Sequence, residues 1–192
     1  MGTPAGVDGA RRHTWKRGRL IAIAVVAILV GSTATALAQQ EDPRARESYR
    51  AQLAGGNEVP ANQSASLGRA GVRLAVNADF ATFELQLLNE LANATQAHIH
   101  MAAPGSNGPI VVWFYPSGPP AAPPQTFNRV SLASGTFGPA NLVGPLAGNW
   151  DGFVNALHAG NLYVNVHTSA FPPGEIRGQL APASEVPRGP DD

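Results

Sequence analysis

Two histidines separated by one residue are the part of this sequence best suited to chemistry. His98 and His100 lie in residues 94–101, whose alternation of apolar and polar side chains predicts a β-strand. Side chains two residues apart leave a strand on the same face, with Cα atoms about 7 Å apart, so both imidazoles can reach one metal ion. His167 stands on the polar face of a second predicted strand, residues 162–168, and is the candidate third ligand.

Glu175 opens a further predicted strand, residues 175–180, and could be a fourth ligand or could orient an imidazole through a hydrogen bond. The chain contains no cysteine, so a site built on three imidazoles suits zinc or copper(II). The alternative is that these histidines only make hydrogen bonds across a sheet. No nucleophile motif and no phosphate-binding glycine loop is present, so the sequence predicts neither catalytic residues nor an organic cofactor.

Three other polar residues are predicted to have structural roles. Asn165 shares a strand face with His167, and Glu58 lies within a turn-rich segment, residues 55–60. Arg177 carries a planar guanidinium, which suits it to hold loop carbonyls or a carboxylate.

The elements that must position these residues are mostly short strands. Glycine and proline separate apolar or alternating runs at intervals near ten residues, and this spacing predicts an all-β, antiparallel, Greek-key-like sandwich or barrel. Apolar residues at helical spacing in residues 150–159 predict one short helix, which Asn149 or Asp151 could cap. The expected strands cover residues 49–53, 70–76, 81–87, 94–101, 110–115, 162–168 and 175–180, with weaker candidates at 127–132 and 142–146.

The first 38 residues have the order of a secretory signal peptide. A basic block, residues 11–19, precedes an apolar run of 11 residues, 20–30, and then Ala36-Leu37-Ala38, which fits a peptidase site. The apolar run is short against the roughly 20 residues that span a bilayer. An uncleaved anchor is the alternative, and the pair Arg11-Arg12 leaves both general and twin-arginine export open. We expect a secreted or periplasmic protein that begins at Gln39 and meets a membrane only during export.

Removal of the signal leaves an acidic chain. Residues 39–192 contain eight arginines, no lysine and twelve acidic residues, a net charge of −4. Nucleic acid is therefore excluded as a partner, and an unknown protein or another extracellular ligand is expected instead. Without cysteine there is no disulfide, so the core must stabilise the domain. We expect a flexible lead-in at residues 39–48, one domain at 49–180 and a disordered tail at 181–192.

Four segments in this order resemble the CHRD domain, which is named for chordin and also occurs in exported bacterial proteins. The resemblance covers about residues 49–180. It implies an extracytoplasmic β-sandwich-like domain with a protein-interaction role, and it ties the chain to no known enzyme activity. The segments are Leu53-x-Gly55-x-Asn57-Glu58-Val59-Pro60, Ala97-His98-Ile99-His100 with Gly105-x-Asn107-Gly108-Pro109-Ile110-Val111, Tyr163-Val164-Asn165-Val166-His167-Thr168, and Pro173-Gly174-Glu175-Ile176-Arg177-Gly178-Gln179.

Overall fold

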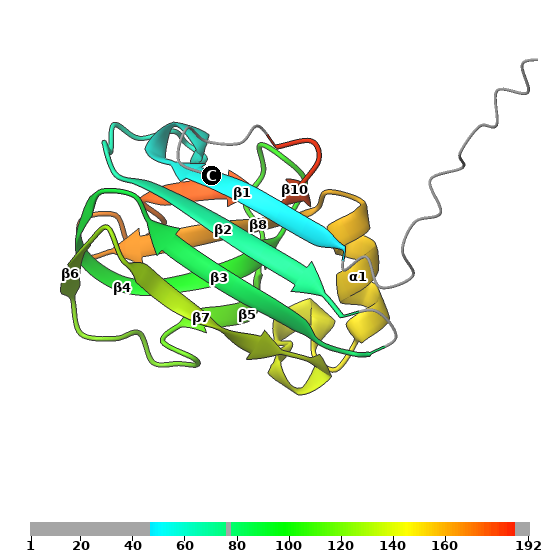
Figure 1. The fold of residues 1–192 in the computed structure, drawn as a ribbon. Helices are drawn as coiled ribbons and strands as arrows, with labels where there is room; N and C mark the ends of the chain where they lie inside the picture. The colour runs from blue at the N-terminus through cyan, green and yellow to red at the C-terminus, as the bar shows by residue number, and fades with distance from the viewer. Residues whose placement is uncertain (1–46, 76–77, 187–192) are drawn as a thin grey trace, which may run out of the picture. The chain divides into compact units, whose positions relative to one another are not determined.

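Strands dominate the computed structural model, which describes residues 47–75 and 78–186. The ten strands of these residues form one antiparallel sheet that curls into a nearly closed barrel (Figure 1). Its bounds are β1 Ser48–Ala54, β2 Leu67–Leu74, β3 Ala81–Leu87, β4 Glu90–Met101, β5 Ile110–Tyr115, β6 Gln125–Asn128, β7 Ser131–Phe137, β8 Leu162–Thr168, β9 Ile176–Gln179 and β10 Ala181–Pro182, with one α-helix, α1 Trp150–His158.

The strand order runs β5-β4-β8-β9-β1-β2-β3-β7. Strand β4 is long enough to pair β6 with its first half and β5 with its second half, while β8 pairs along its other edge. In Figure 1, β1, β2, β3 and β7 lie in front of β8, β4 and β5. The candidate ligands therefore belong to two adjacent strands, β4 and β8, in one of these layers.

The core lies inside the curled sheet and takes one face of each strand, as the alternation of side chains predicts. Phe83 of β3 and Phe114 of β5 stack with ring centroids 3.9 Å apart, which joins the two layers near the unpaired edges of the sheet. Burial of one such aromatic ring stabilises the fold by about 1.5–3 kcal/mol. Fully buried aliphatic residues from both layers are Leu53, Val72, Leu85, Ile99, Val164, Val166 and Ile176.

The helix covers part of this core. Trp150, Phe153 and Leu157 recur at helical spacing and are all buried, so they form one apolar face. The Asn149 side chain accepts a hydrogen bond from a backbone N–H of the first turn at 2.9 Å, which caps the helix. Gly160, at φ +68°, follows the last turn in the left-handed conformation that ends many helices.

The predicted fold class, an antiparallel all-β fold with one short helix, is confirmed. Strands expected at 81–87, 110–115 and 162–168 have the predicted bounds. The strand expected at 142–146 is wrong. That region forms the 3-10 turns Pro139–Asn141 and Gly144–Leu146, whose prolines lack the N–H that strand pairing needs.

The predictions for the two ends of the chain have different outcomes. The segment expected to be a disordered tail begins with β10, which pairs with β1. The predicted signal peptide and nearly all of the predicted lead-in lie outside the described residues. Among the residues that the structure describes, no helix is long and apolar enough to cross a membrane.

Candidate metal centre

The polar face of the β4–β8–β9 layer is buried, although alternation alone predicts a polar surface. His98 of β4 lies opposite Asn165 of β8, which lies opposite Arg177 of β9. Their exposed fractions are 0%, 2% and 2%. Loops cover this face, so its hydrogen bonds and charges act away from water, where they are stronger and where an unpaired group is costly.

Three imidazoles converge on this buried face. His98, His100 and His167 each offer one ring nitrogen, and these three nitrogens lie within 4.8 Å of one another. The closest contact joins His98 Nδ1 to His167 Nε2 at 3.2 Å. Exposed fractions of His100 and His167 are 8% and 6%, so bulk water reaches little of the cluster.

Hydrogen bonds to backbone carbonyls fix two of the rings. His100 Nδ1 donates to the Gly108 carbonyl at 2.9 Å, and His167 Nδ1 donates to the Pro172 carbonyl at 2.8 Å. A carbonyl only accepts, so each Nδ1 carries the proton and each Nε2 carries a lone pair. Such a contact to the second ring nitrogen is what orients histidines that bind metals.

The remaining nitrogens follow from this assignment. Because His167 Nε2 is an acceptor, the proton between it and His98 belongs to His98 Nδ1, which leaves a lone pair on His98 Nε2. His98 Nε2 and His100 Nε2 are buried without a hydrogen-bond partner among the described residues. A buried acceptor of this kind costs about 1–3 kcal/mol, so two in one cluster require an explanation.

Burial also keeps the rings neutral. Loss of solvation, followed by the neighbouring His167 and His100, lowers the pKa of His98 to about 2. Burial lowers the pKa of His100 to about 4 even though Gly108 opposes the shift, and it lowers the pKa of His167 as well. All three imidazoles are therefore in the form that binds metals at neutral pH.

Aromatic rings enclose the cluster. Trp113 of β5 meets His98 edge-on at 4.2 Å between centroids, and Tyr163 of β8 stacks on His100 at 5.0 Å. The Arg177 guanidinium lies 3.4 Å from the centre of the Tyr163 ring. Guanidinium, phenol and imidazole thus form a continuous stack from β9 to β4.

Glu175 lies outside the group of ligands. Its carboxylate accepts hydrogen bonds from the hydroxyls of Ser64 at 2.7 Å, Ser66 at 3.2 Å and Thr168 at 2.6 Å. Glu175, the candidate fourth ligand, therefore fastens the segment before β2 to β8 and is not part of the group of converging histidines.

The three predicted structural residues lie beside the cluster. Asn165 Nδ2 donates to Glu58 Oε1 at 2.7 Å. Burial raises the pKa of Glu58 to about 7, although Arg177, a backbone N–H and Asn165 all oppose the shift. Arg177 donates to Asn107 Oδ1 at 3.0 Å and to a loop carbonyl at 2.8 Å, so its partners are neutral oxygens rather than a carboxylate.

Trp113 is part of this face, although the sequence predicts only that residues 110–115 form a strand. Trp113 of β5 pairs with His98 of β4, so the two side chains leave the sheet on the same face. The backbone carbonyls of Gly108 and Pro172 also contact the histidines. The sequence could not predict these contacts, because every residue has a backbone carbonyl.

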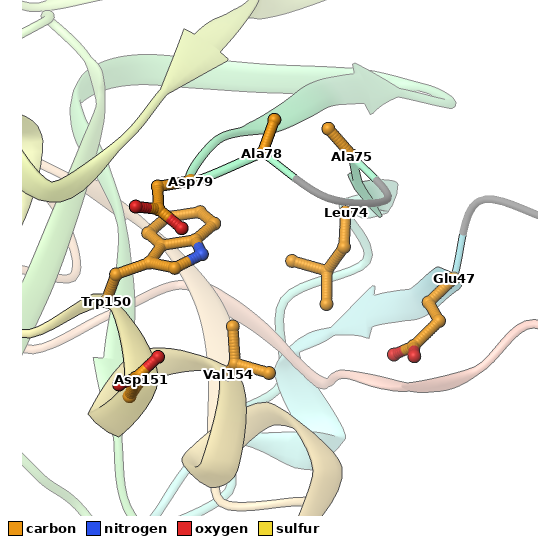
Figure 2. A pocket seen from close by; sticks show the side chains of 8 residues that line it. All are labelled: Glu47, Leu74, Ala75, Ala78, Asp79, Trp150, Asp151 and Val154. Atoms are coloured by element: carbon orange, nitrogen blue, oxygen red, sulfur yellow. The ribbon is translucent and has the colours of Figure 1, made fainter. Parts of the chain in front are cut away.

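A surface hollow of about 310 Å³ lies elsewhere and shares no residue with the cluster (Figure 2). Leu74, Trp150 and Val154 form its apolar part, and carboxylates lie around them. Nothing links this hollow to the histidine cluster.

These features define a nearly closed antiparallel β-barrel that carries a buried histidine cluster between its sheet and its loops. The chain belongs to the CHRD-domain family, because the family model matches residues 49–180. Comparisons with curated proteins and with solved structures gave no match.

The four family-like segments meet around the cluster. Asn57 Nδ2 donates to the Arg177 carbonyl at 3.0 Å, and Asn107 Nδ2 donates to the Val59 carbonyl at 2.7 Å. Together with the bond from Asn165 to Glu58, these contacts tie all four segments into one network. The segments that carry the resemblance therefore build the wall of the candidate site.

Proposed function

We propose that this protein is an exported, non-enzymatic module that binds a transition-metal ion, copper or zinc, through His98, His100 and His167. The observation that supports this most strongly is the convergence of three neutral, buried imidazoles whose ring nitrogens lie within 4.8 Å of one another. Two of their lone pairs have no other partner among the described residues.

The dimensions of the cluster fit this proposal. Metal–nitrogen bonds of about 2.0–2.1 Å imply separations of about 3.3–3.6 Å between ligand nitrogens. The cluster needs side-chain shifts of about an ångström to reach this arrangement, and the 3.2 Å contact between His98 and His167 already lies near it. Binding between these two nitrogens must displace the proton that His98 Nδ1 shares with His167 Nε2.

The family match supports a second function, a structural or protein-binding module in which the histidines bind no metal. In that case His100 and His167 hold the loops onto the sheet through the Gly108 and Pro172 carbonyls. The two functions differ in one measurable property, the metal content of protein prepared without a histidine tag.

The test is a titration of tag-free, metal-free protein with zinc(II), with copper(II) and, without oxygen, with copper(I), followed by calorimetry and elemental analysis. We expect one equivalent to bind wild type and no site of comparable affinity in His98→Ala or His167→Ala. His158→Ala is the matched control, because His158 is exposed and bonds only Glu47 and the Tyr49 ring among the described residues. Near-UV circular dichroism shows whether each variant is folded. Equal binding by wild type and the cluster variants refutes the proposal.

Export rests on the sequence alone, through the basic block, the apolar run and Ala36-Leu37-Ala38. The mature protein is then secreted or periplasmic and begins at Gln39. N-terminal sequencing of protein from the extracellular or periplasmic fraction tests this. A chain that begins at Met1 in the membrane fraction contradicts it.

A further inference from the structure

The candidate metal centre contains no negatively charged ligand. All three members of the group are neutral imidazoles, and Glu175 is bonded to three hydroxyl groups instead. Glu58 bonds Asn165 and is not part of the group either. A bound ion therefore keeps its full formal charge, which no described ligand offsets.

Burial makes that charge costly. The rings of His98, His100 and His167 have exposed fractions of 8% or less, so an ion between them loses most of its hydration. The cost of moving an ion from water into a medium of low dielectric constant rises with the square of its charge. The desolvation free energy of a divalent ion is thus about four times that of a monovalent ion of similar size.

A fixed positive charge adds to this cost. Arg177 is 2% exposed, and its hydrogen bonds run to Asn107 and the Ser106 carbonyl, which are neutral. Its guanidinium stacks on Tyr163, which in turn stacks on His100. The repulsion between this charge and a bound ion is proportional to the charge on the ion, so it also disfavours a divalent cation.

The number of ligands in the cluster also disfavours a divalent ion. The described residues supply three nitrogens, so zinc(II) or copper(II) needs water or another group to complete its coordination, and burial of the cluster limits access of water. The Trp113 ring stands against His98.

From these observations we infer that the histidine centre selects a monovalent soft ion, copper(I), over zinc(II) and copper(II). This inference rests on the proposed metal-binding function and specifies the charge of the ion that the site accepts. Silver(I) has the same charge as copper(I) and does not change oxidation state in the assay, so it tests the preference for charge directly.

The experiment measures the affinities of tag-free protein for silver(I), zinc(II) and copper(II), and for copper(I) without oxygen against a chromogenic chelator. We expect silver(I) and copper(I) to bind at least about 100-fold more tightly than zinc(II). Copper(I) should also bind more tightly than copper(II). Trp113 fluorescence should change with one equivalent of silver(I), and Trp113→Phe should remove this response.

A second variant changes the charge of the ligand set. His98→Glu places a carboxylate beside His100 and His167, and we expect it to raise the ratio of zinc(II) to silver(I) affinity by about 100-fold or more. Both affinities are measured on the same variant and compared as a ratio. A general loss of stability therefore lowers both affinities alike and does not change the ratio. His158→Glu is the matched control outside the cluster and should leave the ratio unchanged.

The outcomes separate this inference from the proposed function. If wild type binds zinc(II) or copper(II) as tightly as copper(I) and silver(I), the preference for a monovalent ion is wrong while metal binding stands. An unchanged ratio in His98→Glu also overturns the preference. Failure to bind any of the four ions refutes both proposals.

Discussion

Arg177→Lys should destabilise the domain strongly although it keeps the positive charge. Arg177 is buried, and two of its nitrogens donate separately to Asn107 Oδ1 and the Ser106 carbonyl while its plane covers the Tyr163 ring. A lysine has one compact head group in place of this planar fork, so it cannot reach both acceptors and cover the ring together. At least one of the two hydrogen bonds is lost.

The size of the effect follows from these contacts. Loss of one hydrogen bond from a charged donor costs about 1–3 kcal/mol, and loss of the guanidinium stack on the ring adds about 1 kcal/mol. The sum is about 2–4 kcal/mol. A domain of this size loses roughly 3–4 °C of melting temperature for each kcal/mol, so Arg177→Lys should melt about 7–15 °C below wild type.

Calorimetry or circular dichroism of metal-free protein at pH 7 measures this difference. Arg73→Lys is the control, because Arg73 lies on β2 with an exposed side chain, and it should melt within about 1 °C of wild type. If Arg177→Lys melts within about 2 °C of wild type, the two directed hydrogen bonds contribute little and the reasoning about the guanidinium fork is refuted.

Two further predictions concern the same buried layer. Gly174 has φ +141°, and a Cβ there would lie 2.3 Å from Asn165 Nδ2 and 2.7 Å from Glu58 Oε1. Gly174→Ala should therefore lower the free energy of unfolding, measured in urea, by about 3–5 kcal/mol. Gly160→Ala, also at positive φ but with open space around it, should cost only about 1–2 kcal/mol, and equal losses would show that the close contacts do not matter. The lowered pKa values of the buried histidines mean that only the unfolded chain takes up protons below pH about 6.5, so stability is present above that pH and is lost as the pH falls. The raised pKa of Glu58 acts in the opposite direction, with stability lost as the pH rises through 7, so between pH 7 and 5 Glu58→Gln should lose about 2 kcal/mol more stability than wild type. A variant curve that runs parallel to the wild-type curve would contradict this assignment.

Alternation of side chains is what made much of the fold predictable. The strand at residues 81–87 has apolar side chains at every second position, and its bounds agree with β3. The same rule placed His98 and His100 on one face and His167 on a polar face of β8, and the structure brings these faces together because β4 and β8 pair. The pairing itself was not predictable, since alternation fixes the faces of a strand but not its neighbours.

Two errors have clear physical causes. The strand predicted at residues 94–101 begins four residues earlier, at Glu90, because the first half of β4 pairs with β6, a strand whose short sequence gives little signal. Glu175 was assigned to the metal on strand position alone. The three hydroxyl groups that bind it come from distant parts of the chain, and a single sequence does not show that they converge there.

The pairing of β1 with β10 also determines how the domain responds to force. Tyr49 lies opposite Pro182, and the Ala183 N–H donates to the Ser48 carbonyl at 2.8 Å, so the two ends of the domain leave it side by side. Tension between the flanking segments therefore peels this short antiparallel pair apart one hydrogen bond at a time instead of shearing several bonds together. Ends separated by about one strand spacing, roughly 4.8 Å, also suit the domain for insertion into a surface loop of a host protein without stretching that loop.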